Sequence, residues 1–167
     1  MLLEPLTVGA GWSETIDMVG IADYMNSGLP VVLKLETDTA TDYFVGFNRA
    51  TGVNSQNDEA DNEVTIVETG NNGEGYSQSF LKATLVQGES YALLNFGGSG
   101  HDLVIDASSI TDNGSNPWVA TVDIRLGACS TNVECDDDNA CNGVETCNTG
   151  TALCEADPNV SLLLCEH

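Results

Sequence analysis

The chain has 167 residues, of which 41% are hydrophobic, and its 26 acidic and four basic residues give a net charge of −22. This apolar content is sufficient for a packed core and argues against disorder over the whole length. The charge excludes nucleic acids and anionic membranes as partners, because proteins bind them through Lys and Arg. Cations suit such a surface, as does a saline medium that screens the self-repulsion. No run of about 18 apolar residues exists that would span a membrane.

The first part of the chain is a series of short β-rich runs separated by clusters of Gly, Asn, Ser and Asp. Such turn residues mark the connections between strands. The predicted strands are 15–22, 30–36, 43–47, 63–68, 79–86, 91–96, 103–107 and 118–126. No segment of useful length shows the period of about 3.6 residues that predicts a helix.

Alternation within these runs indicates strands that are buried on one side. In 118–126, apolar residues stand at every second position from Trp118 to Leu126, while Thr121, Asp123 and Arg125 stand between them. This pattern is typical of antiparallel sheets with one polar face. We therefore predict an all-β domain in residues 1–127. It would be an antiparallel, jelly-roll-like β-sandwich of about eight or nine strands, with Trp118 buried.

A separate region begins at Ala128, where the alternation stops. All six cysteines follow it: Cys129, Cys135, Cys141, Cys147, Cys154 and Cys165. Zinc sites normally contain closely spaced cysteine pairs or nearby histidines, and only His167 lies near these cysteines. We therefore predict a disulfide-rich module in 128–167, because a region this short cannot bury enough apolar surface to fold alone. Six cysteines allow about 15 pairings, so the connectivity stays open, and a partner of Cys165 could lie beyond this chain.

Disulfides predict an oxidising location, extracellular or at the cell surface. The first residues lack the basic start and apolar stretch of a signal peptide, so we expect a piece of a longer secreted protein. The acceptor triplets at Asn113 and Asn159 agree with secretion and predict glycosylation.

The segment after Cys135 is rich in acidic side chains. Oxygen ligands in a loop held by cysteines suit a hard cation such as calcium. The candidate ligands are Asp136, Asp138, Asn142 and Glu145. Their spacing differs from that of the EF-hand loop, so a solvated acidic loop without a metal is the alternative.

Catalytic residues cannot be nominated in this chain. His101 follows a Gly-rich hairpin tip and is expected to be a loop residue, and no hydroxyl has a placed base beside it. Aromatic residues that could stack against sugar rings are few. Trp12, Tyr24 and Tyr76 lie in loop-like segments and stay candidates for that role.

Several strings in residues 4–126 are distinctive. They are GIADY at 20–24, DYFVGFNRATGVN at 42–54, NEVTIV at 62–67, GESY at 88–91, NFGGS at 95–99 and VATVDI at 119–124. Together they resemble the gametolysin-like family of secreted zinc metallopeptidases, in its algal and diatom branch. The resemblance implies a β-sandwich that follows a catalytic domain. The strings ECDD at 134–137 and ACNGVETC at 140–147 are similar to short repeats appended to extracellular proteins of marine algae and bacteria.

The catalytic signature of that family does not carry over. It consists of His-Glu-x-x-His and a third histidine around one zinc ion, whereas this chain contains only His101 and His167. The resemblance therefore implies that zinc belongs to an upstream peptidase domain.

We predict a non-catalytic ancillary region that stabilises such a peptidase or positions its substrate, an extracellular glycoprotein or polysaccharide of matrix or cell wall. An independent calcium-dependent adhesion or carbohydrate-binding module is the alternative, and a truncated gene product without function is a third.

Overall fold

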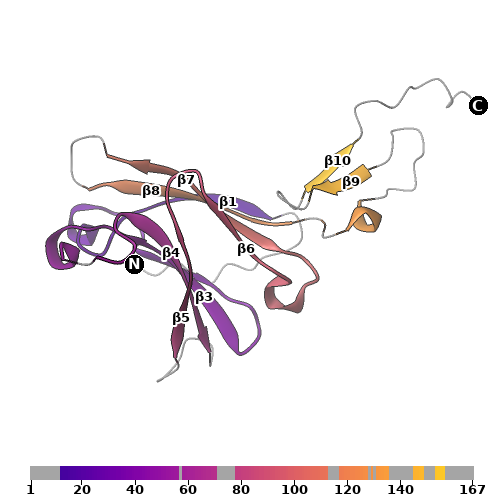
Figure 1. The fold of residues 1–167 in the computed structure, drawn as a ribbon, viewed down its shortest axis with the longest axis horizontal. Coiled ribbons are helices and arrows are strands. Elements are labelled where there is room, and N and C mark those ends of the chain that lie inside the picture. Colours follow the sequence, from indigo (N-terminus) through magenta and orange to yellow (C-terminus); the bar gives the residue numbers. More distant parts are fainter. Residues whose placement is uncertain are drawn as a thin grey trace, which may run out of the picture.

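The computed structural model describes residues 12–56, 58–70, 78–112, 117–127, 129, 131–135, 145–148 and 153–156. Eight strands in this part of the chain form two antiparallel four-stranded sheets (Figure 1). One sheet has the order β1 (Ser13–Met18), β8 (Val119–Leu126), β7 (Leu103–Thr111) and β6 (Ser90–Leu93). The other has the order β2 (Val32–Leu35), β3 (Thr41–Asn48), β4 (Glu63–Gly70) and β5 (Ser79–Leu85). The chain passes from one sheet to the other after β1 and returns after β5. Within each sheet, neighbouring strands follow one another in the sequence, and β8 alone pairs with a distant strand, β1.

The core lies between these two sheets and follows the predicted alternation. In β8 every second residue from Ala120 to Leu126 is buried, and the residues between them are half-buried. The inward side chains of the facing sheet come from β2, β3, β4 and β5. The buried core residues are Ile16, Met18, Leu33, Leu35, Val45, Phe47, Val64, Ile66, Leu85, Leu93, Phe96, Leu103, Ile105, Ala107, Ala120, Val122, Ile124 and Leu126. The prediction of an all-β chain with antiparallel sheets is therefore confirmed, and each of the eight predicted strands coincides with one of β1 to β8.

Most strand boundaries differ from the predicted ones by one or two residues, and three differ by three or four. The first strand ends at Met18, because the next residue bonds to the backbone carbonyl of Pro30 and the chain turns into a short 3-10 helix, η1 (Tyr24–Asn26). The sixth strand ends at Leu93, because Asn95 adopts a left-handed conformation before η4 (Phe96–Gly98). The seventh strand continues to Thr111, because a bulge between Ala107 and Ser109 absorbs the change in alternation.

Cysteines form a second buried cluster outside this core, consisting of Cys129, Cys135 and Cys147. It packs beside a hairpin of β9 (Glu145–Asn148) and β10 (Leu153–Ala156), after the short η5 (Asn132–Glu134). The hairpin lies beyond one end of the sandwich, and the loops that follow β1 and β3 lie at the other end (Figure 1). The domain boundary at 127–128 stays a prediction.

Candidate interaction site at the loop end of the sandwich

Arg49 stands where three connections meet, those from β1 to β2, from β3 to β4 and from β7 to β8. Its Nη1 donates a hydrogen bond of 2.9 Å to Oδ1 of Asn62. Its guanidinium carbon lies 3.7 Å from the ring centroid of Trp118, a cation–π contact. Its Nε lies 3.9 Å from Oδ2 of Asp23. We call Asp23, Arg49, Asn62 and Trp118 the Arg49 cluster.

The Asp23–Arg49 pair is buried and held by charge rather than by a hydrogen bond. Asp23 is 4% exposed, and the Arg49 side chain is 11% exposed. The distance of 3.9 Å exceeds hydrogen-bond range, and neither Oδ2 of Asp23 nor Nε of Arg49 has another hydrogen-bond partner among the described residues. Each charge therefore depends on the other for compensation, because water does not reach either of them freely.

Asparagine side chains hold the connection from β3 to β4 in shape. Asn62 has a φ of 57°, a left-handed conformation that Asn tolerates better than most residues, and its Oδ1 also accepts a bond from the backbone of Ala50. Asn48 donates from Nδ2 to the backbone carbonyls of Glu59 at 2.8 Å and Ala60 at 3.1 Å. These bonds satisfy two carbonyls of the loop, and they help to give it a defined conformation.

Close backbone approach joins this loop to the loop after β1. A Cβ placed on Gly20 would overlap the Cβ of Arg49, so only glycine fits there. A Cβ on Gly52 would lie 3.3 Å from the Cβ of Ala22. Gly52 begins the short η2 (Gly52–Asn54) with a φ of 54°, a conformation that favours glycine. The two loops therefore pack directly on each other.

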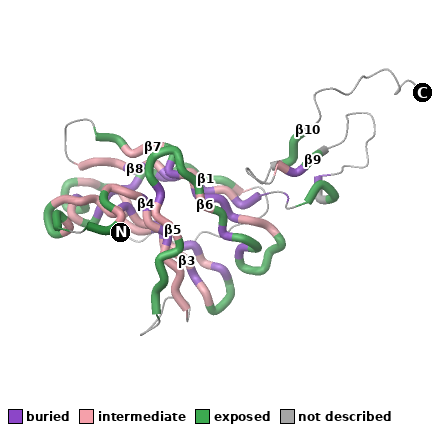
Figure 2. The backbone as a smooth tube through the Cα atoms, in the orientation of Figure 1, coloured by how far each residue is buried: buried purple, intermediate pink, exposed green. Residues whose placement is uncertain are grey.

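Exposed apolar side chains cover the outside of these two loops. Ile21 is 51% exposed, Tyr24 50%, Met25 76% and Val53 85%. In Figure 2, stretches of these loops at this end of the sandwich have the colour of exposed residues. We call these four residues the apolar loop surface. Scattered apolar residues on a surface are normal, but four on two loops in contact are of the kind that marks interaction sites.

Acidic residues flank this surface, and the four basic residues of the chain are all paired with acidic ones. Asp58, Glu59 and Asp61 are exposed on the connection from β3 to β4. All four basic residues form ion pairs: Lys34 with Asp42 and Glu36, Arg49 with Asp23, Lys82 with Glu68, and Arg125 with Asp106. The charge that a partner meets here is therefore negative.

The best-defined of the other ion pairs lies in the sheet of β2 and β3. Nζ of Lys34 is 3.0 Å from Oδ2 of Asp42. The Asp42 side chain is 1% exposed, and its other oxygen, Oδ1, accepts a hydrogen bond of 3.2 Å from the backbone N–H of Thr37. Hydrogen bonding and charge attraction from Asp42 raise the pKa of Lys34 above its ordinary value, although burial opposes the shift. Glu68 likewise raises the pKa of Lys82.

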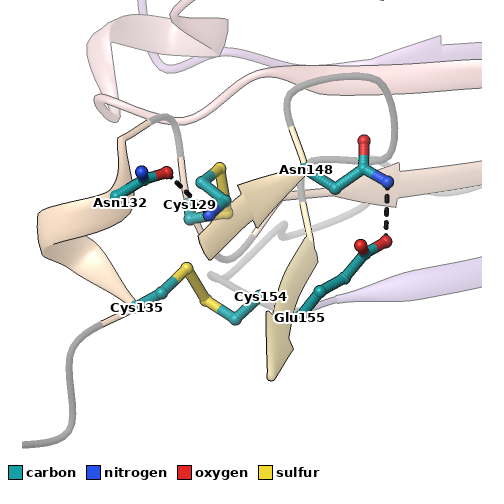
Figure 3. Close-up of a disulfide and its surroundings, with 7 residues drawn as sticks. Cys129, Asn132, Cys135, Asn148, Cys154 and Glu155 are labelled. Carbon is teal, nitrogen blue, oxygen red and sulfur yellow. Dashed lines mark hydrogen bonds between the residues drawn. A yellow bond between two sulfur atoms is a disulfide. The ribbon is translucent and has the colours of Figure 1, made fainter. Parts of the chain in front are cut away.

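Two disulfides organise the cysteine cluster (Figure 3). Cys129 is bonded to Cys147, and Cys135 to Cys154. Cys147 and Cys154 are direct cross-strand partners in the β9–β10 hairpin, so the two bridges leave it side by side. Oδ1 of Asn132 accepts a 3.0 Å bond from the backbone of Cys147 and fixes η5 against the hairpin. The predicted disulfides are thus present for these four cysteines, whereas Cys141 and Cys165 lie outside the described residues.

Most other predicted site residues also lie outside the described part of the chain. These are the calcium candidates Asp136, Asp138 and Asn142, the side chain of Glu145, the glycosylation candidates Asn113 and Asn159, and Tyr76. Calcium binding and glycosylation therefore stay predictions.

The described aromatic candidates differ in exposure. Tyr24 belongs to the apolar loop surface, whereas Trp12 is half-buried against the core. The expectation that Trp118 is buried is wrong: it lies just before β8 and is half-buried, packed against the core, with the Arg49 guanidinium over its ring. His101 lies in the predicted loop, where its backbone N–H donates to Oγ of Ser99.

The Arg49 cluster was not predicted from the sequence. A signal was present, because Arg49 is one of only four basic residues and stands between a strand and a Gly-containing turn. The distinctive strings at 20–24 and 42–54 supply Asp23 and Arg49 to this one place. Alternation patterns do not predict contacts between the side chains of different loops, because they contain no information on which loops lie close together.

The fold and these sites define an all-β, antiparallel sandwich protein with a disulfide-bonded hairpin. Comparison with known protein families, curated proteins and solved structures found no match. Among the described residues, no helix is long and apolar enough to cross a membrane.

Proposed function

We propose that this chain is the non-catalytic ancillary region of an extracellular, gametolysin-like metalloendopeptidase. In this role it stabilises the peptidase domain or positions a matrix or cell-wall glycoprotein for cleavage. The apolar loop surface is the observation that carries the proposal. The two disulfides support an extracellular setting, because such bonds persist in oxidising compartments.

The apolar loop surface suits contact with another domain because it is mounted rigidly. Asp23 and Arg49 fix the base of the two loops, and Gly20 lets them pack without a gap. A preformed surface loses little conformational entropy on binding, so more of the contact energy remains as affinity. Burying Met25 and Val53 contributes on the order of 1.5–3 kcal/mol for each side chain.

Charge defines the chemistry of the partner face. The acidic side chains of Asp58, Glu59 and Asp61 flank the apolar residues, and the basic residues are already paired within the chain. A complementary face has an apolar centre and a basic rim. This is the face that we propose on the peptidase domain or on its substrate.

Proteolysis itself falls to the partner domain. Zinc peptidases of this kind need three protein ligands to the metal and a general base, and the chain has only His101 and His167. The residues present do not fit a catalytic zinc ion, so zinc chemistry in the parent protein belongs upstream.

The test begins with the 5′ sequence of the transcript. An upstream domain with the zinc-binding histidine motif is expected, and a reading frame that begins at Met1 would contradict the proposal. The peptidase domain is then produced with and without this chain, and its melting temperature and its kcat/KM on a matrix glycoprotein are measured. A gain in either quantity is expected when the chain is present.

Matched variants locate the contact. Met25→Ser with Val53→Ser removes two members of the apolar loop surface and is expected to weaken the two-domain contact about 10-fold or more. Leu94→Ser is the control, because Leu94 is 76% exposed but lies on another part of the sandwich. If Leu94→Ser weakens the two-domain contact as much as the double variant does, the contact does not lie at the apolar loop surface.

One observation favours the second candidate function, an independent calcium-dependent adhesion or carbohydrate-binding module. Tyr24 is half-exposed on the apolar loop surface, where its ring is accessible for stacking against a sugar. Titration with calcium and a glycan array would test this candidate. Binding that Tyr24→Ala abolishes would support it, and absence of binding to both calcium and glycans would reject it.

A further inference from the structure

The two disulfides bring four sulfur atoms from four separate segments into one place. Cys129 follows β8, Cys135 follows η5, Cys147 lies on β9 and Cys154 on β10. The Sγ atoms of Cys129, Cys135 and Cys147 all lie within 4.8 Å of one another. Cys154 is exposed and is not one of these three, but its bond to Cys135 places its sulfur next to the group. Figure 3 shows both bridges beside the hairpin and η5.

This arrangement has the donor set of a tetrathiolate metal site. Zinc bonds to thiolate sulfur at about 2.3 Å, so the sulfurs of a tetrahedral site lie about 3.8 Å apart. The Cys135 sulfur would approach those of Cys129 and Cys147 by no more than ~1 Å, and the two sulfurs of each disulfide would separate to the tetrahedral distance. The paired Cα atoms, 5.8 Å and 5.4 Å apart, leave room for that change without unfolding the hairpin.

The backbone around the sulfurs is held independently of the disulfides. Cys147 and Cys154 are opposite each other in the β9–β10 ladder. Asn132 binds the backbone of Cys147 through its side chain, and its own carbonyl accepts a bond of 3.1 Å from the backbone of Cys135. Three of the four cysteines are buried, with 1%, 7% and 9% exposure. Water reaches a buried metal site less easily, so it competes less with buried thiolates for the metal than with exposed ones.

We propose that these four cysteines, when reduced, bind one soft divalent cation such as Zn²⁺ or Cd²⁺. An external thiol reductant supplies two electrons and two protons to each disulfide and is itself oxidised to a disulfide. A phosphine supplies the two electrons and becomes a phosphine oxide with the oxygen of one water molecule, whose two protons go to the sulfurs. Either route yields four thiols. The cation then binds four thiolates and releases four protons. Disulfides and metal are alternative states of one cluster, because a sulfur in a disulfide is not a thiolate ligand. The region therefore keeps a cross-link in both oxidising and reducing surroundings.

The test uses the full chain with Cys141→Ser and Cys165→Ser, so that only the four cluster cysteines remain. After anaerobic reduction and removal of the reductant, Cd²⁺ is added and the ultraviolet thiolate-to-cadmium charge-transfer band is recorded. Reactive thiols are counted in parallel. Saturation at one Cd²⁺ per chain with protection of all four thiols is expected, and the oxidised protein is expected to produce no band.

Two variants separate a built site from adventitious binding to free thiols. Cys135→Ser removes a ligand and is expected to weaken Cd²⁺ binding at least ~10-fold. Asn132→Ala leaves all four thiols in place but removes the bond that positions Cys147, so it too is expected to weaken binding. Binding unchanged in Asn132→Ala, or a ratio other than one Cd²⁺ per chain, would overturn the proposal. Near-ultraviolet circular dichroism of Trp12 and Trp118 verifies that the sandwich stays folded in every sample.

Discussion

Replacing Arg49 with Met tests whether the buried ion pair holds the loop end of the sandwich together. Met preserves the apolar stem of the side chain and removes its charge and its donors. The carboxylate of Asp23, 4% exposed, would then be buried without a countercharge. The hydrogen bond of 2.9 Å to Asn62 and the stacking on Trp118 would also be lost.

The expected cost follows from this geometry. Two unit charges 3.9 Å apart interact by about 4 kcal/mol at an effective dielectric constant of about 20. Breaking a buried pair by removal of one partner typically costs about 3–5 kcal/mol. Because both side chains are nearly buried, little of this value is lost to solvent screening. We therefore expect Arg49→Met to lower the free energy of unfolding by ~3–5 kcal/mol.

Urea denaturation followed by tryptophan fluorescence measures the effect, with Trp12 and Trp118 as probes. Asp23→Asn in the Arg49→Met background removes the orphaned charge, and it is expected to restore at least ~1 kcal/mol. If Arg49→Met leaves too little folded protein, Arg49→Lys keeps the charge and allows the same comparison at smaller cost.

Lys82→Met is the matched control, because its ion pair with Glu68 is considerably more exposed, at 33% and 27% of the two side chains. An exposed pair is worth less than ~1 kcal/mol. Equal losses for Arg49→Met and Lys82→Met would refute the reasoning. So would a double variant that is no more stable than Arg49→Met alone.

The remaining predictions concern backbone fit, pH and calcium. Gly20→Ala is expected to lower the free energy of unfolding by ~1–3 kcal/mol in the same urea assay, because the new Cβ would overlap a neighbouring side chain. Gly28→Ala is the control: nothing lies close to its new Cβ, and little change in the free energy of unfolding is expected. The raised pKa of Lys34 stabilises the fold fully below its ordinary value of 10.5 and loses that effect as pH rises through the higher folded value. Alkaline unfolding of Lys34→Met is therefore expected to be less steep than that of the wild type, and equal slopes would contradict the assignment. Calorimetric titration of the wild type with calcium is expected to produce a heat of binding, which replacement of Asp136 and Asp138 by Asn is expected to abolish. Heat that persists in this variant would exclude both residues as ligands.

The strands could be predicted because each one carries its own signal. In 118–126 the alternation from Trp118 to Leu126 shows directly which residues point inward, and the structure buries Ala120, Val122, Ile124 and Leu126. Strand ends were less predictable. The end of β1 at Met18 depends on the bond from the backbone of Val19 to the carbonyl of Pro30, a residue on the far side of the following turn.

The candidate site could not be predicted in the same way. Asp23, Arg49 and Trp118 lie far apart in the chain, and each has an ordinary local context. Their partnership exists only because both sheets of the sandwich end in loops on the same side. From the sequence alone, Ile21 and Met25 are ordinary strand or turn residues, and only the structure places their side chains at the surface.

The sequence by itself determined the all-β class, the order of the eight sandwich strands along the chain and the use of cysteines as cross-links. These features depend on local alternation, on turn residues and on composition, which are written along the chain. Only the tertiary structure decided which sheet each strand joins, which cysteines pair, and that Arg49 sits between Asp23 and Trp118. These features depend on contacts between distant segments, which form where packing and charge compensation are satisfied together. Such contacts produce no periodic pattern in the sequence, so they could not be predicted from it.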